Sequence, residues 1–69
     1  MMQFTVEQVH AAQPWAIRNA TGNRHISQFF ATQQEAEVFA NAMNQTWEKQ
    51  KRKNLTKCIE TAKALTSQA

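Results

Sequence analysis

The residues with the clearest capacity for chemistry are the lysines and arginines of WEKQKRKNLTK, residues 47–57. Five of the eight basic residues of this 69-residue chain fall in this segment, with Glu48 as its one acidic residue. The five are Lys49, Lys51, Arg52, Lys53 and Lys57. Concentrated positive charge attracts the phosphates of nucleic acids, but basic residues also form the solvated face of many helices. Both interpretations stay open on composition alone.

Groups that serve in catalysis or metal binding are scarce in the chain. The sequence contains no Asp or Tyr, one Gly, one Cys and two His. A zinc site needs several His or Cys at close spacing, and a phosphate-binding loop needs glycines. We therefore expect no enzyme activity, no metal ion and no cofactor. Cys58 has no second cysteine with which to form a disulfide, and we expect a small buried residue there.

The N-terminal residues MMQFTVEQVH lack the basic segment and the apolar run of a secretion signal. No stretch of the chain approaches the roughly 18 apolar residues that a membrane-spanning helix needs. The sequence therefore predicts a cytoplasmic protein that does not enter a membrane.

Alternating apolar and polar residues predict three strands in the first half of the chain. The first covers residues 3–9, the second is WAIRN at 15–19, and the third is RHISQFF at 24–30. Residues 20–23 contain Gly and Asn, which tolerate the backbone angles of a tight hairpin turn. The register of the third strand stays open, because Phe29 interrupts the alternation and favours a bulge.

A helix is predicted to start at Gln33, because Thr32 and Glu35 have the spacing of a capping box. Apolar residues at helical spacing form a first stripe that covers the sheet, with Val38 on the opposite side. The members of this stripe are Ala36, Phe39, Ala40, Met43 and Trp47. A second stripe is rotated by about 75° from the first. Its members are Leu55, Cys58, Ile59, Ala62 and Leu65.

The second stripe has no obvious place on a sheet that the first stripe already covers. An unbroken helix over residues 33–66 would be about 50 Å long, whereas a seven-residue strand spans about 23 Å. We expect the helix to continue as a long rod, or to bend or break near residues 51–54. The second stripe then either folds back as a hairpin or contacts a partner chain, which makes it a candidate homodimer interface.

The predicted fold class is α+β, with a three-stranded antiparallel sheet packed on one helix in the order β-β-β-α. The C-terminal helix is either extended or broken into a second helix. We divide the chain into a sheet-plus-helix domain at residues 1–48 and a basic, then amphipathic, helical extension at residues 49–69.

The spacing Trp15-x-Ile17-Arg18-x-x-x-Gly22-x-Arg24, followed by Phe30-x-Thr32-x-x-Glu35-Ala36, resembles the arm-type DNA-binding domains of phage and transposon tyrosine integrases. Small bacterial domains share the same pattern. The resemblance covers about residues 13–42 and implies a helix-backed, three-stranded sheet that enters the major groove. It implies that Arg18 and Arg24 contact DNA. From the alternation alone, the outer face of the sheet would carry four small or polar residues, Thr5, Arg18, His25 and Ser27.

Two functions remain in competition. The first is a small non-enzymatic nucleic-acid-binding or nucleoprotein accessory module that uses the sheet and the basic segment. The alternative is a protein-binding module or inhibitor, encoded by a phage or mobile element, that dimerises through the second stripe. Ion pairing with Glu7 or Glu35 is a structural alternative for Arg18 and Arg24.

Overall fold

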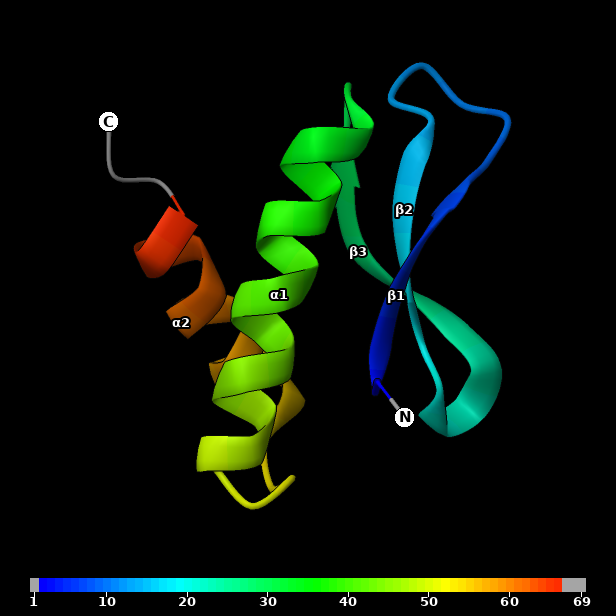
Figure 1. Ribbon diagram of the computed structural model, residues 1–69. Helices are drawn as coiled ribbons and strands as arrows, with labels where there is room; N and C mark the ends of the chain where they lie inside the picture. The colour runs from blue at the N-terminus through cyan, green and yellow to red at the C-terminus, as the bar shows by residue number, and fades with distance from the viewer. Residues whose placement is uncertain (1, 67–69) are drawn as a thin grey trace.

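The computed structural model describes residues 2–66. The elements are β1 (Phe4–Gln8), β2 (Trp15–Asn19), a short 3-10 turn (Thr21–Asn23), β3 (Arg24–Phe30), α1 (Gln33–Lys49) and α2 (Leu55–Thr66) (Figure 1). The predicted α+β class is confirmed, and the C-terminal region forms a second helix. The predicted boundary between residues 48 and 49 falls in the last turn of α1, and residues 67–69 of the predicted extension lie outside the described residues.

The three strands form one antiparallel sheet in the order β1-β2-β3. Between β2 and β3 the pairing passes from Ala16–Phe29 to Arg18–His25, so β3 contains two more residues than β2 over this interval. Two extra residues keep the alternation in phase, because side chains alternate between faces with a period of two. This bulge settles the register that the sequence left open, and it places the 41% exposed Phe29 on the outer face.

The hairpin turn between β2 and β3 lies where its residue types predict it. Gly22 has φ 79° and Asn23 has φ 53°. Glycine has no Cβ to clash at positive φ, and asparagine tolerates this region better than most residues.

Helix α1 starts at the predicted cap. The Thr32 hydroxyl accepts a hydrogen bond from the Glu35 backbone N–H at 3.2 Å and donates one to the Glu35 carboxylate at 3.0 Å. These bonds satisfy one of the N–H groups that the first turn of a helix leaves without a partner.

The helical region breaks over residues 50–54, which include the predicted interval 51–54, although no Gly or Pro occurs there. The N–H groups of Gln50, Lys51 and Arg52 donate to carbonyls in the last turn of α1 at 2.9, 3.1 and 2.9 Å. Asn54 then caps the new helix, because its side-chain oxygen accepts from the Lys57 N–H at 2.9 Å. An asparagine cap, rather than a helix breaker, therefore marks the start of α2.

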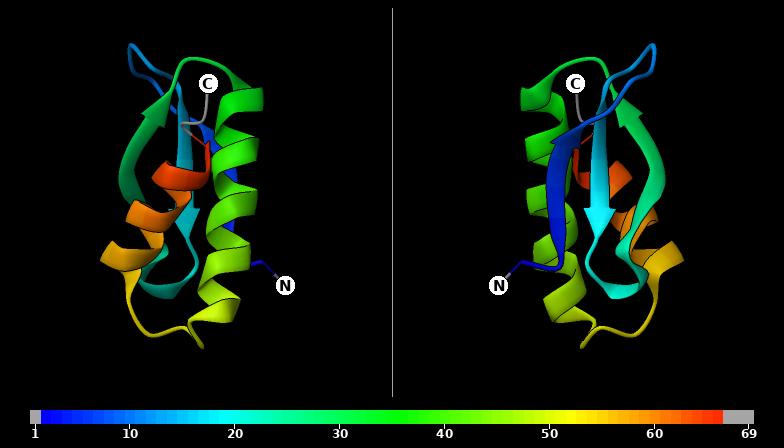
Figure 2. Two further views of the ribbon diagram at one scale, coloured as in Figure 1. Left: turned by 90° about the vertical axis from the view of Figure 1, so that its left-hand side faces the viewer. Right: turned by 90° about the vertical axis from the view of Figure 1, so that its right-hand side faces the viewer.

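Both helices lie on one face of the sheet, and α2 folds back antiparallel to α1 (Figure 2). Residues from all three strands and both helices share one core, so α2 is part of the same packed unit as the sheet. The buried members of this cluster are Phe4, Ile17, Ile26, Phe39, Ala40, Met43, Cys58 and Ala62. Over residues 2–66, neither helix combines the length and apolar character that crossing a membrane requires.

Candidate nucleic-acid interface

The basic segment forms the turn that joins the two helices. We call Lys49, Lys51, Arg52, Lys53 and Lys57 the basic turn, and all five side chains are exposed. They surround the end of the molecule where α1 stops and α2 begins, drawn in yellow at the lower edge of Figure 1. The charge is therefore concentrated at one end of the helical hairpin instead of being spread along a helix face.

The backbone of this turn is unusual for the residue types it holds. Lys51 has φ 56° and Arg52 has φ 61°. Lys51 occupies the position after a helix end where glycine is most common, since a side chain in this left-handed region costs about 1–2 kcal/mol. Two consecutive long basic residues therefore have left-handed backbone conformations that are unfavourable for residues with a side chain.

Little within the fold compensates the charges of the basic turn. Arg52 Nε lies 3.3 Å from Glu48 Oε2, but both side chains are about 70% exposed and such pairs add little stability. Lys49, Lys51, Lys53 and Lys57 have no salt bridge to any residue in the described range 2–66. Four cations at this end are therefore available to an external anion.

The outer face of the sheet holds a second charged group, which we call the sheet cluster: Glu7, Arg18, Asn23 and His25. Arg18 donates two parallel hydrogen bonds to the Glu7 carboxylate, from Nε at 2.8 Å and from Nη2 at 2.7 Å. Its Nη1 donates to the Asn23 side-chain oxygen at 2.7 Å and to the Asn23 carbonyl at 3.1 Å. His25 Nε2 completes the cluster by bonding to Glu7 Oε2.

These contacts change the ionisation of the sheet cluster. The hydrogen bonds from Arg18 and then His25 lower the pKa of Glu7 from about 4.5 to about 2, despite the opposing effect of burial. The same bond with Glu7 raises the pKa of Arg18. Arg18 thus forms the ion pair with Glu7 that was one of its two expected roles, and its DNA contact stays a prediction.

Arg24 lies on the other face of the sheet. It pairs with Asn19 of β2, which in turn pairs with the fully buried Phe4 of β1. Residues directly opposite one another on neighbouring strands share a face, so Arg24 lies on the side of the sheet that carries the helices. The two arginines that the integrase resemblance implicates therefore lie on opposite faces, with Arg18 on the outer face and Arg24 on the helix-bearing face.

The second apolar stripe is divided between the core and the surface. Cys58 and Ala62 are fully buried, Leu55 and Ile59 are half-buried against the core, and Leu65 is 54% exposed. The Cys58 thiol donates to the Met43 carbonyl at 3.3 Å, and burial raises the pKa of that thiol. The chain therefore folds back as a hairpin. Most of the stripe that was a candidate dimer interface packs against α1 and the core instead.

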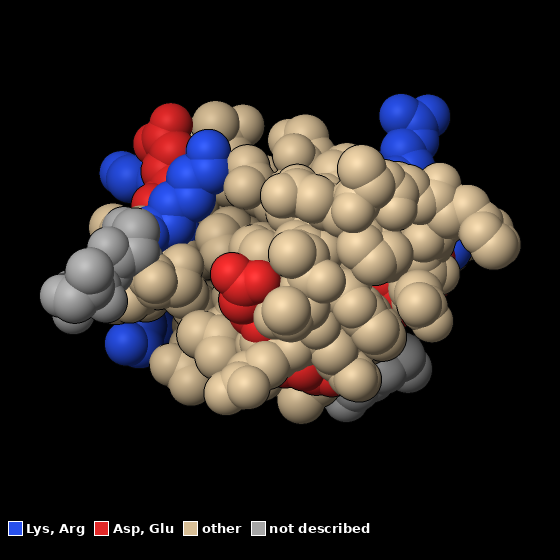
Figure 3. Space-filling view, turned by 90° about the horizontal axis from the view of Figure 1, so that it is seen from above, with Lys and Arg blue, Asp and Glu red and all other residues tan. Residues whose placement is uncertain are grey.

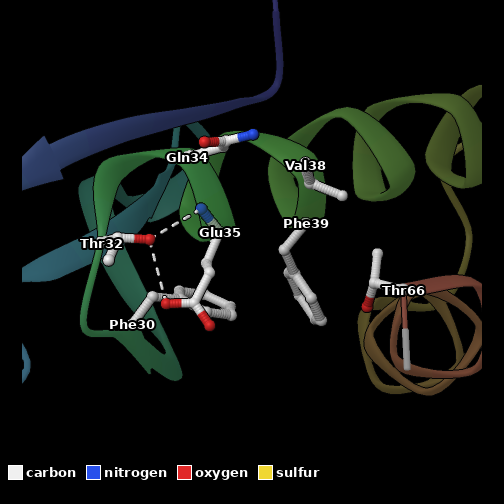
Figure 4. A pocket seen from close by; sticks show the side chains of 7 residues that line it. All are labelled: Phe30, Thr32, Gln34, Glu35, Val38, Phe39 and Thr66. Carbon is white, nitrogen blue, oxygen red and sulfur yellow. Dashed lines mark hydrogen bonds between the residues drawn. The ribbon is translucent and has the colours of Figure 1, made fainter. Parts of the chain in front are cut away.

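A groove at the opposite end of the hairpin was not predicted from the sequence. It has a volume of about 320 Å³, and the rings of Phe30 and Phe39 lie 5.2 Å apart beside it. Figure 4 shows the Phe30 ring beside the Glu35 carboxylate and the Phe39 ring between Glu35 and Thr66, with Val38 on the turn of α1 above Phe39. Seen from above in Figure 3, most of this end is neither basic nor acidic. The two ends of the molecule thus differ sharply in charge.

Comparison with protein-family models, curated proteins and solved structures finds no significant match. The part of the chain that the structure describes contains no group of three His, Cys, Asp or Glu side chains positioned to bind a metal ion. The integrase resemblance therefore stays a prediction.

The sequence pattern locates the basic turn, but it does not identify two residues that shape these surfaces. Glu7 is one possible partner of Arg18 by sequence, and in the structure it is bonded to both Arg18 and His25. Asn54 is the second, because it caps the start of α2. A signal for Asn54 was present, because asparagine followed by a new apolar helical pattern is typical of a helix N-cap.

Proposed function

We propose that this chain is a small, non-enzymatic nucleic-acid-binding or nucleoprotein accessory module that holds the phosphate backbone with its basic turn. The observation that carries the proposal is the pair of adjacent basic residues, Lys51 and Arg52, at positive φ on an exposed turn. Glycine or asparagine would fit these two positions with less strain. A location in the cytoplasm belongs to the same proposal.

The backbone N–H groups of Lys51 and Arg52 close the end of α1, but a glycine at either position would make the same bonds. Strained residues whose side chains add little to the fold favour a role outside it. Lys51 makes no salt bridge with any described residue, and Arg52 makes one exposed pair with Glu48. Three further lysines on the same turn are equally uncompensated. Phosphate is the ligand that such a cluster fits best, because lysine supplies a mobile point charge and arginine a forked donor.

The expected mode of binding is electrostatic and independent of base sequence. Each contact with phosphate releases a condensed counterion, so affinity falls steeply as salt concentration rises. Phosphate contacts position a protein on a nucleic acid but do not read its sequence.

The deciding experiment measures binding of the whole chain to labelled DNA at several salt concentrations. Replacing Lys49, Arg52 and Lys53 with Gln should lower the slope of log affinity against log salt by about 3. Lys49→Gln changes helix propensity little, and Arg52 and Lys53 lie outside both helices. A matched control replaces the exposed Gln13, Gln34 and Asn41 with Glu, which also lowers the net charge by three. This control should keep most of the slope.

Two results would contradict the proposal. One is a wild-type chain with no salt-sensitive binding to DNA or RNA at low ionic strength. The other is an equal loss of binding in both triple variants, which would show that net charge matters and that the basic turn does not.

The alternative, a protein-binding module that dimerises through the second stripe, has less support. Cys58 and Ala62 are fully buried inside the chain, and Leu65 is the member of that stripe with the largest exposed fraction that the structure gives, 54%. Light scattering tests it. A dimer that Leu65→Asp converts to a monomer would favour the alternative over nucleic-acid binding.

A further inference from the structure

Two turns that are far apart in sequence lie at the same end of the molecule. The hairpin turn between β2 and β3 and the basic turn between α1 and α2 both lie at the lower end in Figure 1, and both views of Figure 2 agree. The opposite end carries the β1–β2 loop and the start of α1. An extended surface that lies across this end of the molecule can therefore contact both turns.

Arg24 adds a separate positive charge to this end. It follows the hairpin turn directly, and its side chain is exposed. The pairing with Asn19 places Arg24 on the helix-bearing side of the sheet, the same side as the basic turn. None of the salt bridges or side-chain hydrogen bonds among residues 2–66 involves the Arg24 side chain. Its charge is therefore as available as those of the four lysines.

This end of the molecule lacks the feature that single-stranded nucleic acid requires. Proteins that bind single strands stack the bases on exposed aromatic side chains. Trp47, beside the basic turn, packs its ring edge-on against Phe4 with a centroid distance of 5.6 Å. Phe29 is the one aromatic side chain of the described residues with a large exposed area, and it lies near the other end of β3 from Arg24.

The two positive regions stand on separate, well-packed elements. Arg24 begins a strand, whereas the basic turn closes a helical hairpin, and the sheet and both helices share one core. The Cα atoms span 32 × 32 × 19 Å, so both regions fit within one turn of a double helix, which is about 34 Å. Two turns held at a fixed spacing by one core match a duplex, whose phosphates are fixed in position, better than a flexible single strand.

We infer that the partner is a double helix that the protein contacts at two points; this inference rests on the proposed function. The basic turn contacts phosphates at one point, and Arg24 contacts phosphates at the other. Arg24 is thus a phosphate-binding residue that acts with the helical hairpin and not with the outer face of the sheet.

The test uses a DNA duplex of about 24 base pairs, roughly two helical turns, and one of its single strands. Arg24→Gln should weaken duplex binding by about 3- to 10-fold at low salt and lower the salt slope by about 0.9. Lys63→Gln is the matched control, because it removes one exposed positive charge in the last turn of α2, away from the basic turn. Its effect should be much smaller. The duplex should bind more tightly than the single strand.

The possible failures are distinguishable. If Arg24→Gln and Lys63→Gln behave alike while the triple variant of the basic turn loses binding, the second contact point is wrong and the proposed function stands. A single strand that binds as tightly as the duplex would overturn the double helix as partner. A wild-type chain without salt-sensitive binding would overturn both proposals. Melting curves of each variant show whether the fold survives the substitution.

Discussion

The sheet cluster and the basic turn hold the same kind of charged residue in opposite circumstances. Arg18 donates four hydrogen bonds to Glu7 and Asn23. Lys51 and Arg52 have left-handed backbones and, between them, one exposed ion pair. In the sheet cluster the charges pair with one another and join the three strands. In the basic turn most charges have no counter-charge among residues 2–66 and are available to a partner.

This difference shows that a count of basic residues does not measure the charge available for binding. Arg18 pairs directly with Thr5 and His25, and Glu7 lies diagonally across, two residues along β1 from Thr5. Diagonal neighbours on adjacent strands are within reach of long side chains. A substitution in the sheet cluster should therefore change stability more than binding, and a substitution in the basic turn should do the reverse.

The largest expected effect concerns the core that holds both regions in place. Phe39 is 3% exposed and packs against Phe30 of β3, so Phe39→Ala should lower the free energy of unfolding by about 3–5 kcal/mol. The neighbouring Val38 is 50% exposed, and Val38→Ala should cost less than about 1 kcal/mol. Urea unfolding measures both. Equal losses would show that the buried face of α1 is misplaced.

The next largest change in stability concerns Trp47, which packs beneath the basic turn and carries no charge. Trp47→Ala should cost about 3 kcal/mol, since it removes the edge-on contact with Phe4. Trp47→Phe keeps an aromatic ring there. It should cost about 1 kcal/mol or less, because the buried indole N–H has no hydrogen-bond partner among the described residues. A loss as large as that of Trp47→Ala would show that this N–H is bonded.

The sheet cluster should make stability depend on pH in the acid range. The folded-state pKa of Glu7 is about 2 and its ordinary value is 4.5, so the native state binds the carboxylate proton less readily than the unfolded state. The contribution of Glu7 is therefore complete above about pH 4.5 and is lost as pH falls toward 2.

Urea unfolding at pH 7, 4 and 2.5 checks this window, using Glu7→Gln as the variant. The variant should be less stable at pH 7 and should lose less stability on acidification than the wild type. Glu37→Gln is the control, because Glu37 is exposed and makes no salt bridge to any of residues 2–66. Identical pH profiles for the two variants would mean that the Arg18–Glu7 pair does not stabilise the fold.

The smallest expected change in stability is an increase, and it concerns the basic turn. Lys51→Gly should raise the free energy of unfolding by up to about 1 kcal/mol, because it relieves the positive φ of residue 51. It should also lower the salt slope of nucleic-acid binding by about 0.9. Lys49→Gly, at the last residue of α1, should instead destabilise the chain, by up to about 1 kcal/mol. Thermal melting compares them, and losses in both would mean that the turn is not strained.

Much of the fold was predictable because its signals are local. The alternation in β1 and β2, the Gly-Asn turn and the Thr32–Glu35 cap each involve residues a few positions apart. The interval of the helix break was also predictable, since the two apolar stripes do not align across it. The sequence alone does not determine whether the helix continues, folds back or binds a partner chain.

The candidate site was less predictable, for a physical reason. The sequence located all five residues of the basic turn, but it could not show which charges the fold would neutralise. The Glu7–Arg18 and Glu7–His25 contacts join residues 11 and 18 positions apart, and they depend on the register of three strands.

By itself, the sequence determined the strands, the start of α1 and the concentration of positive charge between the two stripes, because periodicity and capping act within a few residues. Only the tertiary structure decided that α2 folds back to bury Cys58 and Ala62, and that Arg18 and Arg24 lie on opposite faces of the sheet. Those outcomes depend on the packing of distant segments. A one-residue slip of register, for example, would send every side chain of a strand to the other face.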